Sequence, residues 1–442
     1  MIIRWLSRFD LFLKTYLLME MGCVYFLFNY VEGISFTEKA GESVLFRAVW
    51  LLLYAILIVQ IARDIGVFGL LLLQSFWFVA FLSLAVVSLV YNDIEGTSLL
   101  KFAMYLATIL FSAWMAMFRS VDDIMETLFR MGAVVLVLHI LLYPVIGAAI
   151  DYDPLHRATV IGTEAYAGVF GHKNLAGSFF GLMATISFVR MLSGGRTEFL
   201  GSGSLMGLHL VALAATGAAG PLVSVTATLV ITLGLYLIAS GRRAFASFYW
   251  IALGFLAMTL LLVPSGAFYT LVGRTEGLTG RTFLWSVWPH FFWLHPFLGY
   301  GFSGFFNGLP NAPSNELTQM APWNIEFGSF ENSYMELLLQ FGLLGGGVYL
   351  MIIARAVFNV TIFAFRRARA YWLAPFAVLS FILISSLNDS SLLLHNYIAC
   401  VLVFWCYFGP EAEIQERGYW TLLRLRPSIG YLTVSQRISK RR

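Results

Sequence analysis

Apolar runs of about 17 to 25 residues, separated by short polar stretches, repeat along nearly the whole chain. A helix of this length crosses the hydrocarbon core of a bilayer, whereas a barrel strand needs only about ten residues. Because no water satisfies backbone polar groups inside a bilayer, each run predicts an α-helix. The predicted helices, about a dozen, cover residues 11–29, 44–61, 67–90, 99–118, 131–150, 175–191, 205–216, 221–240, 245–263, 334–354, 373–387 and 396–408.

The break between the seventh and eighth predicted helices is tight. Gly217, Gly220 and Pro221 separate two runs that are short or mildly polar. Glycine and proline interrupt a helix, but this spacing leaves only a few residues for a connection. The pattern therefore leaves open whether these runs form two spans or one hairpin.

Composition supports a membrane protein. Of the 442 residues, 59% are hydrophobic and 12% are charged, which leaves too little polar surface for a soluble domain. We find no internal repeat, low-complexity tract or soluble domain in the sequence. The fold class predicted is an all-α polytopic membrane protein, with one membrane domain over residues 1–442.

The distribution of basic residues predicts the orientation. Lys and Arg gather in every second loop, and the alternate loops, such as 31–43 and 92–98, are acidic or neutral. Basic loops stay on the cytoplasmic side, so both termini are expected there, in a bacterial inner membrane. The basic tail, residues 409–442, then fits anionic lipid headgroups rather than nucleic acid. The basic loop residues are Arg4, Arg8, Arg63, Arg119, Arg130, Arg190, Arg196, Arg242, Arg243, Arg355, Arg366, Arg367 and Arg369.

Two loops on the outer side are candidates for a functional site. The first covers residues 151–174, and the second covers 264–333, far longer than an ordinary helix connection. Within the second loop, Thr279 or Thr282 can cap a helix that reaches about Trp293. Arg281, Trp285 and Trp288 would share one face of that helix, which we expect to lie in the membrane interface. Residues 307–328, rich in Pro, Asn and Gly, are expected to form irregular loop.

Five phrases in the second half of the chain occur in a familiar order. They are GVFGHKNLAG, LTGRTFLW, HPFLGYGFSGF, ENSYMELLLQFGLLG and LNDSSLLLHN. Over residues 168–408 the chain resembles the O-antigen ligase and polymerase superfamily, and within it the exopolysaccharide polymerase branch. The resemblance implies a GT-C-like, metal-independent glycosyltransferase without a cofactor. Such an enzyme takes a glycan from undecaprenyl diphosphate on the outer face and joins it to an acceptor sugar hydroxyl. The partners implied are the lipid-linked glycan, an acceptor glycan or lipid, membrane lipids, and a chain-length regulator or export complex.

Outward-facing cations fit this chemistry, because a diphosphate leaving group develops negative charge as its bond to the sugar breaks. Arg281 is the first candidate, with Lys173 and Arg274 in support. Arg281 could instead be an interfacial anchor, and Lys173 a cation that flanks a helix. The other predicted substrate-binding residues are His172 and Asn174, which orient substrate or cap a helix, together with Asn332 and Trp285.

The chain departs from the family pattern at two positions. Glu331 stands where relatives carry a histidine that is the presumed base, and a carboxylate could take over that role or merely face the positive end of a helix. Relatives also have a Ser-Arg or Ser-Lys phrase where this chain reads ATGAAGPLVS, without a cation. These departures keep two alternatives open, a glycan-binding member without catalysis and a transporter of lipid-linked glycans.

Other polar residues have simpler interpretations. Asp151-Tyr152-Asp153 has an Asp-x-Asp spacing, but the following Pro154 favours a turn. His139 and His209 are expected to be hydrogen-bonded inside the bundle. The cysteines Cys23, Cys400 and Cys406 lie in apolar runs without metal-ligand spacing and are assigned to packing.

Overall fold

The computed structural model describes residues 8–23, 43–91, 97–142, 166, 168–170, 172–262, 281–307, 312–321, 327–366 and 371–409. These residues form helices joined by turns, with no strand among them. The helices are α1 Arg8–Glu20, α3 Val44–Arg63, α4 Ile65–Gln74, α5 Phe76–Tyr91, α6 Thr97–Phe118, α7 Val121–Leu142, η3 Gly168–Phe170, α8 Lys173–Ser193, α9 Arg196–Thr216, α10 Ala219–Ala239, α11 Arg243–Leu262, α13 Arg281–Leu294, α14 Pro313–Met320, α15 Ser333–Arg366 and α16 Ala374–Ser385. A last apolar helix covers Ile398–Gly409.

The all-α membrane class is confirmed. Within the described residues, 7 helices are long and apolar enough to cross a membrane, and shorter apolar helices accompany them. The runs at 205–216 and 221–240 are two separate helices, α9 and α10, because Gly217 ends α9 with a left-handed φ of 64° and α10 begins at Ala219. The run at 67–90 is not one helix, since α4 ends at Gln74, Ser75 caps it, and α5 begins at Phe76.

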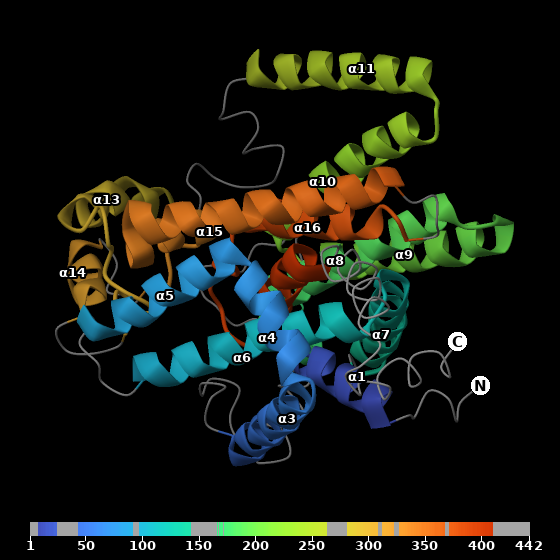
Figure 1. The fold of residues 1–442 in the computed structure, drawn as a ribbon. Coiled ribbons are helices and arrows are strands. Elements are labelled where there is room, and N and C mark those ends of the chain that lie inside the picture. The colour runs from blue at the N-terminus through green and yellow to red at the C-terminus, as the bar shows by residue number, and fades with distance from the viewer. Residues whose placement is uncertain are drawn as a thin grey trace.

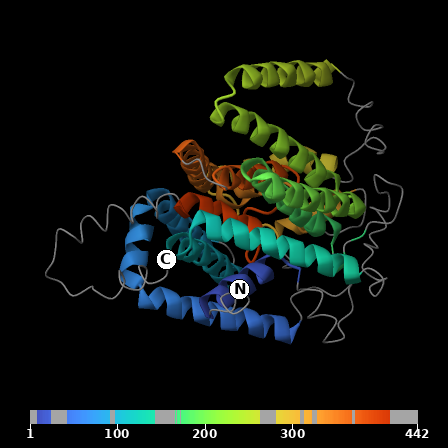
Figure 2. The ribbon, with the colours of Figure 1, turned by 90° about the vertical axis from the view of Figure 1, so that its right-hand side faces the viewer.

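Helix α8 lies at the centre of the bundle. Every residue from Ala176 to Val189 is buried, and α8 packs against α7, α9, α10 and α16. Figure 1 shows α13 and α14 gathered at one end of the molecule, near the first turn of α15, while α11 lies at the periphery beyond α10. Figure 2 shows the same separation of α11 from the rest of the bundle. Figure 1 and the contacts of α8 therefore identify two parts of the fold, a packed bundle and a cap of short helices at one end.

The turn segment after α13, residues 295–307, is inserted into a break in α15. The helix is interrupted at Gly342, whose φ is 60° and ψ is −163°. At this break the N–H groups of Leu343 and Leu344 donate to the carbonyls of Pro296 and Phe297, at 2.8 and 3.1 Å. In the other direction, two N–H groups of the turn segment donate to carbonyls of α15, Tyr300 to Leu339 and Gly301 to Gln340. In an intact helix these N–H and C=O groups of α15 would bond to one another, whereas at the break they are free to bond to the turn segment.

We expect Gly342→Ala to destabilise the protein by about 3 kcal/mol or more, because only glycine adopts this backbone conformation without strain. A Cβ at this position would also overlap the backbone of Phe297. The measurement is thermal unfolding of the purified protein in detergent. Gly347→Ala is the matched control, since it lies on the same helix and its Cβ would meet nothing within 4 Å. Equal unfolding temperatures for the two variants would contradict the constraint.

The structure corrects two expectations about the long outer loop. The region 307–328 contains the helix α14, which begins with Pro313 at its N-terminus, and is not irregular throughout. Helix α13 runs from Arg281 to Leu294 as expected, but its Arg281, Trp285 and Trp288 face packs on protein. The exposed side chains at its end are Trp293 and Leu294.

The structure tests the expectations for the cysteines and for the two histidines of the apolar runs. Cys23, Cys400 and Cys406 are free and buried, as expected for packing residues. The expectation for His139 was wrong, because both ring nitrogens are buried without a hydrogen-bond partner among the described residues, and the ring packs against Tyr166 and Phe180. His209 lies near the hydroxyl of Ser187, at 3.5 Å.

Candidate functional site

The indoles of α13 fix this helix against the start of α15. Trp285 Nε1 donates to the carbonyl of Phe330 at 3.1 Å, and Trp288 Nε1 donates to the carbonyl of Met335 at 3.0 Å. Both indoles are partly buried, and the two bonds together specify how α13 is rotated. This rotation directs Arg281, the first residue of α13, towards the residues that precede α15.

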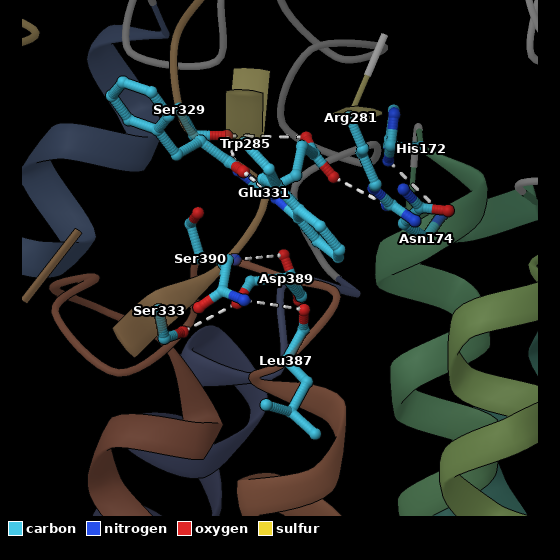
Figure 3. A network of polar contacts seen from close by, with 12 residues as sticks. His172, Asn174, Arg281, Trp285, Ser329, Glu331, Ser333, Leu387, Asp389 and Ser390 are labelled. Carbon is cyan, nitrogen blue, oxygen red and sulfur yellow. Dashed lines mark hydrogen bonds and ion pairs between the residues drawn. The ribbon is translucent and has the colours of Figure 1, made fainter. Parts of the chain in front are cut away.

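Arg281 and Glu331 form an ion pair. Arg281 Nη2 lies 2.7 Å from Glu331 Oε2, and the side chains are 14% and 37% exposed. Glu331 has a left-handed φ of 53°, which is rare outside glycine. Its carboxylate also accepts from Ser329 Oγ at 3.4 Å. Figure 3 shows the Arg281 guanidinium between Glu331 and the N-terminal end of α8.

Asn332 caps α15. Its Oδ1 accepts from the N–H groups of Tyr334 and Met335, at 3.0 and 3.1 Å, and its Nδ2 donates to the carbonyl of Leu387 at 3.1 Å. The cap of this helix is therefore Asn332, while the Glu331 carboxylate faces Arg281. The bond to Leu387 ties α15 to the segment that follows α16, residues 386–397.

That segment presents a second carboxylate, Asp389. Ser333 Oγ donates to the carbonyl of Asp389 at 2.6 Å, and Asp389 Oδ1 accepts from the N–H of Ser390 at 2.8 Å. Burial, and then the negative charge of Glu331, raise the pKa of Asp389 to about 6, against the opposing effects of the Ser390 N–H and of Arg281. This carboxyl group changes its charge close to neutral pH.

Glu336 joins the two segments that carry these carboxylates. Its buried Oε1 accepts from the N–H of Phe330 at 2.8 Å and from Ser390 Oγ at 2.6 Å. Phe330 is adjacent to Glu331, and Ser390 is adjacent to Asp389. The Glu336 side chain thus links the segment of Glu331 to the segment of Asp389. Figure 3 labels both of these carboxylates.

A cleft opens beside these groups. It is lined by Lys173, Asn174, Ser178, Gly217, Ala219, Gly220, Pro221, Arg281, Ser385, Asn388 and Asp389. The first residues of α8, α10 and α13 are all among them. Helix N-termini carry partial positive charge and unpaired N–H groups, so three of them around one cleft favour an anion.

The predicted residues of the first outer loop meet the cleft at α8. Lys173 is its first residue and is only 6% exposed. His172 caps the helix, because its Nδ1 accepts from the N–H of Asn174 at 3.3 Å. Arg274 lies outside the described residues. The structure therefore brings Lys173, Asn174 and Arg281 together, and His172 supports them.

Sequence reasoning missed Asp389, Glu336 and Ser390. The phrase LNDSSLLLHN contains Asp389 and Ser390, and the acidic residue in an otherwise apolar region was the available signal. No spacing links it to Glu331, which is far away in the chain. Within the described residues there is no group of three or more His, Cys, Asp or Glu side chains placed to hold a metal ion.

Comparison with known proteins gives two matches. A family model described as O-antigen ligase matches residues 204–350, which include Arg281 and Glu331. The exopolysaccharide production protein ExoQ of Rhizobium meliloti (strain 1021) is 26% identical over 292 residues, which cover 64% of this chain and 64% of ExoQ. The alignment thus spans less than two thirds of that relative. Both matches agree with the five motifs: the chain is similar to proteins of the O-antigen ligase and polymerase superfamily.

Proposed function

We propose that the protein is a glycosyltransferase of polysaccharide assembly, which moves a glycan from undecaprenyl diphosphate to an acceptor sugar hydroxyl. The observation that carries this proposal is the cleft, where Lys173, Arg281 and three helix N-termini surround one space. A glycan lipid of this class carries a diphosphate, and this arrangement suits the diphosphate in both charge and hydrogen-bond donors.

In the proposed reaction the acceptor oxygen forms a bond to the sugar C1 while the bond from C1 to the diphosphate oxygen breaks. The electron pair leaves with the diphosphate, and Arg281 and Lys173 stabilise its charge. The break that reads ATGAAGPLVS lacks the cation of relatives, but it places the N-terminus of α10 at the cleft. This helix end is a fixed positive group in the same position.

The acceptor proton must pass to a carboxylate, and the site offers two. Glu331, the base predicted from the sequence, contacts Arg281 through Oε2 and accepts from Ser329 through Oε1, so both of its carboxylate oxygens already have partners. Asp389 lines the cleft and has a pKa near 6. A general base works best when its pKa lies near the working pH. We therefore assign the proton to Asp389 and the orientation of Arg281 to Glu331.

The basic residues at helix ends support a cleft on the outer side. Arg63 ends α3, Arg190 lies in the last turn of α8, Arg196 and Arg243 begin α9 and α11, and Arg366 ends α15. Lys173 and Ser333 begin α8 and α15, so the cleft lies at the opposite ends of these helices. Because basic ends face the cytoplasm, we place the cleft outside and both termini inside, in an inner membrane.

We expect a reporter inserted at Thr318, in α14, to be active only outside the cytoplasm, and one fused to the C-terminus only inside. The measurement is the paired activity of alkaline phosphatase and green fluorescent protein fusions in cells. An insertion after Ser240, in the turn between α10 and α11, is the control and should report the cytoplasm. Cytoplasmic fluorescence at Thr318 would place the cleft on the wrong side for this substrate.

The direct test of the proposed function uses purified protein in lipid nanodiscs with an undecaprenyl diphosphate-linked repeat unit and an acceptor glycan. We expect a longer glycan and free undecaprenyl diphosphate in equal amounts. Binding of the lipid-linked repeat unit without release of undecaprenyl diphosphate would instead support a glycan-binding member of an assembly complex. Exchange of the intact lipid-linked glycan between leaflets would support the transporter.

A further inference from the structure

A second cationic position lies outside the cleft, at the same end of the molecule. Lys101 is in the second turn of α6, and its Nζ donates to Ser303 Oγ at 3.2 Å. Ser303 belongs to the turn segment 295–307, and its N–H donates to Gln340 Oε1 of α15 at 2.9 Å. In Figure 1, α6 begins at the end of the bundle where α13 and α14 gather. Lys101 is therefore held by a neutral hydroxyl on the side of the molecule that carries the cleft.

The described part of the chain offers Lys101 a neutral partner, the Ser303 hydroxyl. Among the described residues, no carboxylate lies within ion-pair distance of its ammonium group. The neighbouring ionisable group is His395, and burial, followed by the Lys101 charge, lowers the pKa of His395 to about 4. The imidazole is thus neutral at physiological pH and can donate one N–H. An ammonium group has three donors, and Ser303 accepts only one of them.

Left-handed backbone occurs at Ser303 and at the residue after His395. The described non-glycine residues with left-handed φ are Ser303 at 56°, Glu331 at 53° and Asn396 at 55°. Glu331 belongs to the cleft, whereas Ser303 holds Lys101 and Asn396 follows His395. Strained backbone is retained where the surrounding structure requires it, and it concentrates at ligand sites. Lys101 and His395 therefore each have a neighbouring residue with left-handed φ, as the candidate active site does at Glu331.

The segment 386–397 connects the two places. Asp389 and His395 are six residues apart, so their Cα atoms lie at most about 21 Å apart. The segment is fixed between them, because Ser391 N–H donates to Ser333 Oγ at 2.8 Å and Tyr349 donates to the carbonyl of Leu392 at 2.9 Å. Because this distance is short, one oligosaccharide is long enough to reach from the cleft to Lys101.

We propose that Lys101, Ser303 and His395 form a subsite for an anionic substituent, a carboxylate or a phosphate, on the glycan. Naming the glycan as the source rests on the proposed function. An anionic lipid headgroup has the same chemistry, but Lys101 is half-buried and held by the turn segment, whereas a lysine that serves headgroups extends towards them.

The test measures binding, so that it does not depend on catalysis. The full chain in phosphatidylcholine nanodiscs is titrated with two tetrasaccharides that differ only in one residue, glucuronate in one and glucose in the other. We expect wild type to bind the acidic tetrasaccharide about 10-fold more tightly than the neutral one at low salt, because salt weakens a charge-assisted contact. Lys101→Gln should remove this preference, because it removes the charge. Lys101→Arg should retain most of it. Arg47→Gln, which removes a basic residue from the first turns of α3, is the control and should leave it unchanged.

Equal preference for the acidic tetrasaccharide in wild type and Lys101→Gln would overturn the subsite. A second experiment uses nanodiscs that contain phosphatidylglycerol. If wild type retains this lipid and Lys101→Gln does not, and neither prefers the acidic tetrasaccharide, Lys101 binds a lipid headgroup and the subsite is also overturned. Loss of glycan transfer in Asp389→Asn has no bearing on the subsite. Failure of wild type to transfer glycan, with the acidic preference intact, would contradict the proposed function and leave the subsite standing.

Discussion

Asp389→Asn is expected to lower the rate of glycan transfer by about 100- to 10,000-fold, the range that a positioned general base supplies. The wild-type rate should rise through a pH near 6 and then level off. Below that pH, Asp389 is protonated and cannot accept the acceptor proton, and above it the carboxylate is ionised. The measurement is a pH profile of transfer by the purified protein, with its membrane level and unfolding temperature as checks on folding.

Glu331→Gln distinguishes the two carboxylates. The charge of Glu331 raises the pKa of Asp389, so its removal should move the ascending limb of the profile below pH 6 while the limb persists. Loss of all transfer at every pH in Glu331→Gln, with a normal profile in Asp389→Asn, would instead make Glu331 the base. Asp123→Asn is the matched control, because this carboxylate lies in the first turn of α7, away from the cleft. It should leave both the rate and the limb unchanged.

Arg281→Lys is expected to lose about 100-fold or more of transfer, with the protein still in the membrane. Lysine keeps the charge but not the planar guanidinium, which can contact Glu331 and a phosphate oxygen together. Arg281→Ala should lose at least as much. Arg130→Lys serves as the control, because this arginine also pairs with a glutamate, Glu126, but is 52% exposed on α7. Wild-type polymer from Arg281→Ala would reject the proposed contact with the diphosphate.

A double variant tests whether Glu331 acts through Arg281. If Glu331 serves only to orient the guanidinium, removal of both side chains should cost no more than removal of Arg281 alone. The comparison is Arg281→Gln with the Arg281→Gln and Glu331→Gln combination, in the same transfer assay. Additive losses would mean that Glu331 contributes separately, for example as a second proton acceptor.

The amino-acid sequence by itself determined the membrane class, most of the helical segments and the resemblance to O-antigen ligases and polymerases. Length and hydrophobicity are local properties, and a bilayer leaves helices as the structure that satisfies the backbone of a long apolar run. The motifs also selected Arg281, Lys173 and Glu331, because charged residues are scarce in the apolar regions of this chain. The break in α15 was not predicted, since the glycines of QFGLLGG have no distinctive period and the inserted turn segment comes from elsewhere in the chain.

Only the tertiary structure decided which polar groups meet. The pairing of Arg281 with Glu331, the bridge that Glu336 makes between Phe330 and Ser390, and the place of Asp389 in the cleft join residues from distant parts of the chain. The sequence carries no spacing rule for such contacts, because they depend on how α13, α15 and α16 pack. For the same reason the missing cation suggested a loss in the sequence. Packing brings the N-terminus of α10 to the cleft, where aligned peptide dipoles give partial positive charge without a basic side chain.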